Sequence, residues 1–170
     1  MAAQSIGKLV NLMSQFSTIS LLLFMINLGV TFGAGLYEIR IVVPLWFHPE
    51  PGGSYRVDTV AMQRMDVGRR FWGLVTTLPL SLLTLINLYY AWQAAATQKT
   101  WWLAAVILIL IERVGTFAFF IPTAIRLQRA DSLPSQTVSR LSRRWMLANY
   151  GRIVLTLLGW LLTLKALHVY

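Results

Sequence analysis

Two adjacent charges, Glu112 and Arg113, lie inside an apolar run that extends from Trp101 to Leu127 and is long enough to cross a bilayer. A charge at that depth costs several kcal/mol, so it is usually paired, faces a cavity or takes part in function. A carboxylate can act as a base, and a guanidinium can stabilise an anion. These two residues are therefore candidates for a functional site.

Three further polar residues, Glu38, Asn149 and Arg152, also lie within apolar segments. At about 1.5 Å of rise per residue, their expected depths below the same side of the membrane agree to within about one helical turn. We expect Glu38 to pair with Arg152 or Arg40, and Glu112 to pair with an arginine or with asparagine amides. Such groups either line a polar cavity that opens to the cytoplasm or only lock the helices together.

Other kinds of chemistry find little support in the residue types. The chain has no cysteine, which excludes disulfides and thiolate metal sites. The two histidines, His48 and His168, are expected on opposite sides of the membrane and so cannot ligate one haem together. A metal site on His48 with Glu50 or Met62 is conceivable, but a single loop histidine is more often only a polar loop residue. We therefore expect no metal and no cofactor.

The composition places these residues in a membrane. Hydrophobic residues make up 56% of the 170 residues, charged residues only 12%, and the mean hydropathy is +0.60. A helix of about 20 apolar residues crosses the hydrocarbon core, and four segments reach that length: 17–44, 71–95, 101–127 and 145–168. We expect one integral membrane domain over residues 1–170.

The spans predict an all-α membrane protein, a four-transmembrane-helix bundle with antiparallel up-down topology. The link between the second and third spans is so short that these two helices must be antiparallel neighbours. Before the second span, Asp58 could cap a short interfacial helix, with an apolar face formed by Val57, Val60, Ala61 and Met65. Ser135 could begin a helical extension that runs into the last span.

Positive charges are concentrated in the two long connections, 45–70 and 128–144, and this asymmetry predicts orientation. The connections contain Arg56, Arg64, Arg69, Arg70, Arg129, Arg140, Arg143 and Arg144, whereas the opposite side has Lys8, Lys99 and Lys165. Both termini are therefore expected outside and both connections in the cytoplasm. Anionic lipid headgroups explain the net charge of +9 better than nucleic acid, because no basic groove with interleaved aromatics is present.

Glycine and tryptophan residues indicate how the spans pack. Gly29, Gly33 and Gly35 form a GxxxG motif with an extra glycine, which favours close contact with a neighbouring helix, most simply within the same chain. Aromatic residues cluster at the predicted span ends, as in an interfacial belt: Trp46, Trp72, Trp92, Trp101, Trp102, Trp145 and Tyr170. Trp160 lies deeper, where core packing is its default role.

Short motifs mark the ends of three spans. They are Gly35, Tyr37, Glu38, Pro44 and Trp46 in the first span, Pro122 in the third, and Trp145, Asn149 and Arg152 as W-x3-N-x2-R at the start of the fourth. Together they resemble the anthrone-oxygenase-like family of small four-helix membrane proteins, over residues 20–168. Better-known members of that family are taken to oxidise anthrones to anthraquinones with molecular oxygen and without metal or flavin.

The resemblance implies a cofactor-free oxygenase that acts on a hydrophobic phenolic or anthrone-like substrate. Glu38, Asn149 and Arg152 would be its catalytic residues. Glu38 or Glu112 would serve as the base, and Arg152 with Asn149 would hold the anion. The remaining candidates, which either line the pocket or form structural ion pairs, are Arg40, Glu112, Arg113 and Trp145.

The same residues would also suit a different class of protein. In a non-catalytic accessory or assembly subunit of a larger membrane complex, the charges would only fix the assembly. As partners we expect membrane lipids and no nucleic acid. The sequence leaves open a small hydrophobic ligand, a homo-oligomer and a larger membrane complex.

Overall fold

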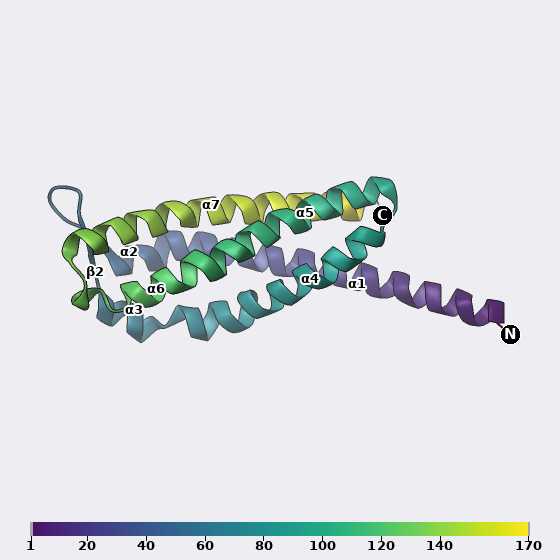
Figure 1. The fold of residues 1–170 in the computed structure, drawn as a ribbon, viewed down its shortest axis with the longest axis horizontal. Coiled ribbons are helices and arrows are strands. Elements are labelled where there is room, and N and C mark those ends of the chain that lie inside the picture. Colours follow the sequence, from purple (N-terminus) through teal and green to yellow (C-terminus); the bar gives the residue numbers. More distant parts are fainter. Residues whose placement is uncertain (1, 170) are drawn as a thin grey trace.

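The structure, a computed structural model, describes residues 2–169, with the side chains of residues 2–6, 9 and 10 excepted, and it is a bundle of long helices (Figure 1). Within these residues, four helices are long and apolar enough to cross a membrane: Asn11–Trp46, Gly68–Gln93, Ala96–Leu127 and Ser135–His168. The predicted all-α membrane bundle with four spans is therefore confirmed. Tyr170 of the predicted aromatic belt lies outside the described residues.

Three of the four long helices contain a segment of wider, π-helical turns. The first helix consists of α1 (Ala2–Tyr37), η1 (Glu38–Val42) and α2 (Val43–Trp46). The second joins η2 (Gly68–Thr77) to α4 (Leu78–Gln93), and the third joins α5 (Ala96–Gly115), η3 (Thr116–Phe120) and α6 (Ile121–Leu127). The fourth, α7 (Ser135–His168), is regular and includes the extension expected from Ser135.

A proline follows each π segment at the same position. The last π hydrogen bonds run from the N–H of Val43, Leu78 and Ile121 to the carbonyl five residues earlier, and the next residues are Pro44, Pro79 and Pro122. Proline has no N–H, and its ring displaces the carbonyl four residues before it. A wider turn before the proline relieves that clash while the helix continues. The first helix therefore continues through Pro44 to Trp46, two residues beyond the end of the predicted segment 17–44.

The connection between the first two spans is more structured than expected. Strands β1 (Phe47–Pro49) and β2 (Tyr55–Val57) pair antiparallel, and Gly52 and Gly53 adopt φ values of +87° and +79° in the loop between them. The expected helix follows as α3 (Thr59–Met65), and the Asp58 carboxylate accepts a hydrogen bond of 2.7 Å from the Ala61 N–H. Its buried face differs from the prediction, because Val60 is 73% exposed whereas Met62 is buried.

Helix α7 packs against α1 and α5, and α4 packs against the same two helices (Figure 1). Small residues permit the close approach. A Cβ added at Gly29 would lie 3.2 Å from Trp160, one at Gly35 would lie 3.0 Å from Ile153, and one at Gly33 would meet nothing within 4 Å. The glycine motif therefore serves helix packing within the chain, as expected, through two of its three glycines. Trp160 packs on Gly29 and Phe32 and has the core role assigned to it.

The third connection, which precedes α7, contains the short 3-10 helix η4 (Ala130–Ser132). The Thr59 hydroxyl donates a hydrogen bond of 2.8 Å to the Asp131 carboxylate, which joins α3 to this connection. The two long connections thus meet at one end of the bundle, next to an apolar cluster that includes Trp46, Phe47 and Trp145.

Candidate functional site

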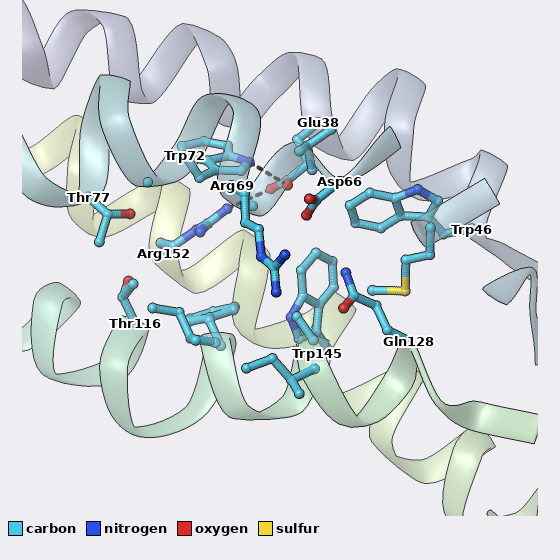
Figure 2. A pocket seen from close by; sticks show the side chains of 18 residues that line it. Glu38, Trp46, Asp66, Arg69, Trp72, Thr77, Thr116, Gln128, Trp145 and Arg152 are labelled. Atoms are coloured by element: carbon cyan, nitrogen blue, oxygen red, sulfur yellow. Dashed lines mark hydrogen bonds and ion pairs between the residues drawn. The ribbon is translucent and has the colours of Figure 1, made fainter. Parts of the chain in front are cut away.

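A cavity of about 300 Å³ lies at the end of the bundle that carries α3 (Figure 2). Its wall comes from all three π segments and from α2, α3, α6 and α7. Most of the wall is apolar, with Trp46, Phe120 and Trp145 as aromatic members. The polar and charged side chains on it are Glu38, Asp66, Arg69, Trp72, Thr77, Thr116, Gln128 and Arg152.

The cavity opens to the surface between η2 and α6. On the η2 side, the lining residues Gly68 and Arg69 are exposed. On the α6 side, the lining residues Ile121 and Ile125 are 39% and 49% exposed. A Cβ added at Gly68 would meet nothing within 4 Å, so a side chain at this position has open space.

Glu38 is buried and accepts hydrogen bonds on both carboxylate oxygens (Figure 2). The Trp72 indole N–H donates to Oε1 at 2.7 Å, and Arg152 Nη2 donates to Oε2 at 2.7 Å. Asn149 Nδ2 lies 3.4 Å from the same Oε2. Hydrogen bonds that involve an ionised partner are the stronger ones in proteins, so this carboxylate holds three helices together at one point.

Arg152 is the cation of the cavity wall beside this carboxylate. Its guanidinium carbon lies 4.7 Å from the centre of the Trp72 ring and 4.9 Å from the centre of the Phe120 ring. Its side chain is 11% exposed. Contacts of this kind are more favourable when the cation is desolvated. Arg152 is thus fixed in position by Glu38 and by two aromatic rings, with its charge next to the cavity.

The π segments place these partners. Glu38 is the first residue of η1, Trp72 lies within η2, and Thr116 and Phe120 are the first and last residues of η3. An extra residue in a helical turn rotates the following side chains by about 100° relative to a regular helix. The proline-linked turns therefore decide which side chains of three helices reach the cavity.

Asn149 occupies a different place from the one expected. It lies at the depth of Glu38 and Arg152, but it is fully buried behind the carboxylate and does not line the cavity. Its Oδ1 atom has no hydrogen-bond partner in the part of the chain that the structure describes. The structure thus brings the three predicted catalytic residues together, with only Glu38 and Arg152 on the cavity wall.

Glu112 and Arg113 form a separate, closed ion pair. Arg113 binds the Glu112 carboxylate through Nε at 2.5 Å and through Nη2 at 2.7 Å, and the Thr116 hydroxyl donates to the same carboxylate at 3.0 Å. Both residues are buried, and neither lines the cavity. Glu112 therefore has the arginine partner expected for it, but its pair belongs to the core, not to the cavity.

Of the two other predicted site residues, Arg40 lies outside the cavity and Trp145 lines it. Arg40 is exposed and forms no ion pair with Glu38, which pairs with Arg152 instead. Trp145 lines the cavity and packs against Trp46, Phe47 and Phe120, with ring centres 5.7–6.1 Å apart.

Sequence reasoning missed Trp72, Phe120 and Asp66 as site residues. The sequence places Trp72 in the predicted interfacial belt, where its ring would face lipid headgroups, and it does not single out Asp66 or Phe120. Trp72 and Phe120 lie seven and two residues before Pro79 and Pro122, so no common spacing in the sequence marked them as site residues. Among residues 2–169, no three His, Asp or Glu side chains are grouped closely enough to hold a metal ion.

A comparison with known protein families gives a match over most of this region. A family model described as Anthrone oxygenase matches residues 62–162, which is more than half of the chain. The matched segment runs from α3 into α7 and includes Asp66, Trp72, Asn149 and Arg152, whereas Glu38 precedes it. No curated protein and no solved structure matches the chain.

Proposed function

The chain belongs to the anthrone oxygenase family, and from this premise we propose that the cavity binds a flat, apolar, weakly acidic phenol or anthrone and oxidises it with molecular oxygen. The observation that carries the proposal is the position of Arg152, a desolvated cation held at the wall of an otherwise largely apolar cavity. A site of this kind favours a ligand that is apolar over most of its surface and becomes an anion during reaction.

The cavity suits a small planar ring system. Its volume of about 300 Å³ is at the lower end of the range of roughly 300–1,000 Å³ that is usual for ligand pockets. Trp46, Phe120 and Trp145 supply aromatic faces on which a polycyclic ring can stack. Apolar walls also favour dioxygen, which has no charge or strong dipole to be solvated.

The proposed reaction replaces two hydrogens on one ring carbon by a carbonyl oxygen. A proton is first lost from that carbon, and the resulting enolate transfers electrons to dioxygen and forms a carbon–oxygen bond. The peroxide so formed takes up a proton. The remaining hydrogen of that carbon is then lost as a proton while the oxygen–oxygen bond breaks, which leaves the carbonyl group and releases the outer oxygen as water. One oxygen atom of dioxygen enters the product and the other leaves as water, so the reaction balances without a further oxidant.

In this proposal Arg152 stabilises the negative charge of the enolate oxygen. Glu38 and Trp72 are positioning residues, since Glu38 fixes the guanidinium and Trp72 binds both the carboxylate and the face of Arg152. Asn149 supports the carboxylate from the buried side. Fixed charges that do not reorganise during reaction are the usual source of large rate enhancements.

The test is substitution of Arg152 in protein purified in detergent, with anthrone as the probe substrate. We expect Arg152→Ala to lower the protein-dependent rate of oxygen uptake and quinone formation by about 10²- to 10³-fold, the usual loss for one donor to a developing oxyanion. Because Arg152→Ala leaves a buried carboxylate short of a partner, Arg152→Gln is tested with it, since glutamine offers Glu38 a neutral donor. Spontaneous oxidation of anthrone is subtracted with protein-free detergent.

The matched control is Arg144→Ala, since Arg144 lies on the same helix but is exposed and is not one of the residues that line the cavity. It should retain the rate of the unsubstituted protein. If the unsubstituted protein neither binds nor oxidises anthrone, and Arg152→Ala instead dissociates from a partner subunit, the oxygenase proposal fails and the accessory-subunit alternative takes its place.

A further inference from the structure

Asp66 has an unusual backbone conformation at the junction between α3 and η2. Its φ and ψ angles of 39° and 44° are left-handed, and among the described residues no other non-glycine residue has a positive φ. Its carbonyl accepts hydrogen bonds from the N–H groups of Arg69 and Arg70, at 3.1 and 3.0 Å. Asparagine and aspartate tolerate this conformation better than other non-glycine residues, and glycine adopts it freely. The backbone therefore favours aspartate here, but asparagine or glycine would serve it equally, so it does not require a carboxylate.

The carboxylate of Asp66 is directed into the cavity, between Glu38 and Trp46 (Figure 2). The residue is half-buried, and none of the side-chain or backbone donors described in the structure bonds its carboxylate. The other charged groups on the cavity wall are Glu38, Arg69 and Arg152. Asp66 is thus a cavity carboxylate whose oxygens are open to a ligand.

The other two candidate bases are occupied. Both oxygens of Glu38 accept hydrogen bonds from Trp72, Arg152 and Asn149, and a proton acceptor needs an oxygen that faces the reacting atom. Glu112 is bound by Arg113 through both of its oxygens and lies outside the cavity wall. Glu38 lines the cavity, but a proton on its carboxylate would weaken the ion pair that holds Arg152, and Glu112 lies outside the cavity wall.

We propose that Asp66 is the proton acceptor of the reaction, a role that rests on the oxidation proposed above. The Asp66 carboxylate takes the proton from the ring carbon while Arg152 holds the enolate oxygen. After the carbon–oxygen bond has formed, Asp66 returns this proton to the peroxide oxygen. It then removes the second hydrogen of the ring carbon as a proton while the oxygen–oxygen bond breaks, and the departing oxygen takes up that proton and leaves as water. The acid and base steps thus belong to one carboxylate, and charge stabilisation belongs to one guanidinium elsewhere on the cavity wall.

The location of Asp66 also suits proton exchange with water. It lies two residues before the exposed Gly68 and next to the exposed Arg69 and Arg70, at the end of the bundle where the two long connections meet. Glu38 lies deeper, within the membrane-spanning part of the first helix. A proton held by Asp66 therefore has a short route to water, which a proton on Glu38 lacks.

The experiment compares Asp66→Asn and Asp66→Gly with the unsubstituted protein, again with anthrone in detergent. Asparagine and glycine both adopt the left-handed conformation, so both variants should fold while they lack the carboxylate. We expect each to lower kcat by about 10²- to 10⁴-fold near neutral pH, the usual contribution of a general base. The loss should shrink as the pH approaches the range where anthrone ionises in solution, because the enolate then arrives already formed.

Two further variants distinguish a proton acceptor from a residue that stabilises the anion or only supports the fold. Arg152→Ala should stay impaired at high pH, since an ionised substrate still needs the cation, and Glu50→Gln, in the exposed hairpin loop, should behave like the unsubstituted protein. A fully active Asp66→Asn or Asp66→Gly variant would refute the role of Asp66 and leave the oxidation proposal intact. Inactivity of the unsubstituted protein would refute both.

Discussion

Arg152 is held from three directions, and each contact restrains a different movement of the guanidinium. The ion pair with Glu38 fixes its end, whereas Trp72 and Phe120 contact it through their rings and exclude water from it. Arginine suits such a position because its planar group can stack on aromatic rings while it donates hydrogen bonds in its own plane. A lysine would keep the charge but lose this orientation.

The indole N–H of Trp72 can be tested apart from its ring. Trp72→Phe keeps an aromatic face for Arg152 but removes the donor to Glu38 Oε1, so a buried carboxylate oxygen loses its partner. We expect a loss of about 1.5–3 kcal/mol in the free energy of unfolding, the usual value for a hydrogen bond to a charged group. Thermal unfolding in detergent measures it.

The control for that substitution is Trp101→Phe, because Trp101 is 37% exposed and lies far from the cavity wall. A Trp72→Phe variant as stable as Trp101→Phe would mean that the indole donor contributes nothing to the site.

For single residues, the sequence predicted well how deep each side chain lies along its helix, but it predicted poorly which way the side chain faces. The rise per residue is fixed, so the common depth of Glu38, Asn149 and Arg152 followed from counting along the helices. Which of them faces the cavity depends on helix rotation, which the π segments change. Trp72, within a π segment, faces inward instead of toward the headgroups, and Asn149, on the regular helix α7, is buried behind Glu38.

At the scale of elements, the three π segments concentrate irregular backbone in the half of the bundle that holds the cavity. The regular half is closed by an apolar cluster around Phe24, Trp102 and Ile109, and by the close packing of Gly159 on Ile109. The sequence predicted the helices and the cap at Asp58, because apolar length and capping residues are local signals. It did not predict the π turns or the hairpin, because prolines and glycines in a sequence usually indicate the end of a helix.

Gly68, at the start of η2, allows a test of the cavity opening. A leucine there meets no protein atom at Cβ, so it should fill the opening without disturbing the fold. We expect Gly68→Leu to lower kcat/KM for anthrone by about tenfold or more, equal to about 1.4 kcal/mol. Gly151→Leu, at an exposed position of α7 with equal space, should leave kcat/KM unchanged. Equal rates for the two variants would show that substrate does not pass between η2 and α6.

For the whole molecule, composition and span length were sufficient to predict a membrane bundle, because an apolar chain of this kind has no other stable environment. Orientation depends on charges that act during insertion, and the folded structure does not record them. The sequence prediction that both termini lie outside therefore rests on the arginine and lysine asymmetry alone.

Cysteine labelling tests this orientation in intact cells, and the absence of native cysteines makes every introduced cysteine unique. Ser54→Cys lies in the hairpin loop, and Thr97→Cys lies in the exposed first turn of α5, next to the short link at the opposite end of the bundle. With both termini outside, an impermeant thiol reagent should label Thr97→Cys and not Ser54→Cys before the cells are opened. The reverse pattern would invert the topology and place the cavity on the outer side.

The opening between Ile121, Ile125 and η2 lies on helices that are apolar enough to be in lipid. A substrate as apolar as the proposed one partitions into the bilayer, so the lipid phase is both its solvent and its reservoir. The quantity that saturates such a protein is the mole fraction of substrate in the membrane, not its concentration in the aqueous volume. Added empty vesicles would then lower the mole fraction of substrate in the membrane and so lower the rate. The quinone formed would return to the same lipid from which its precursor came.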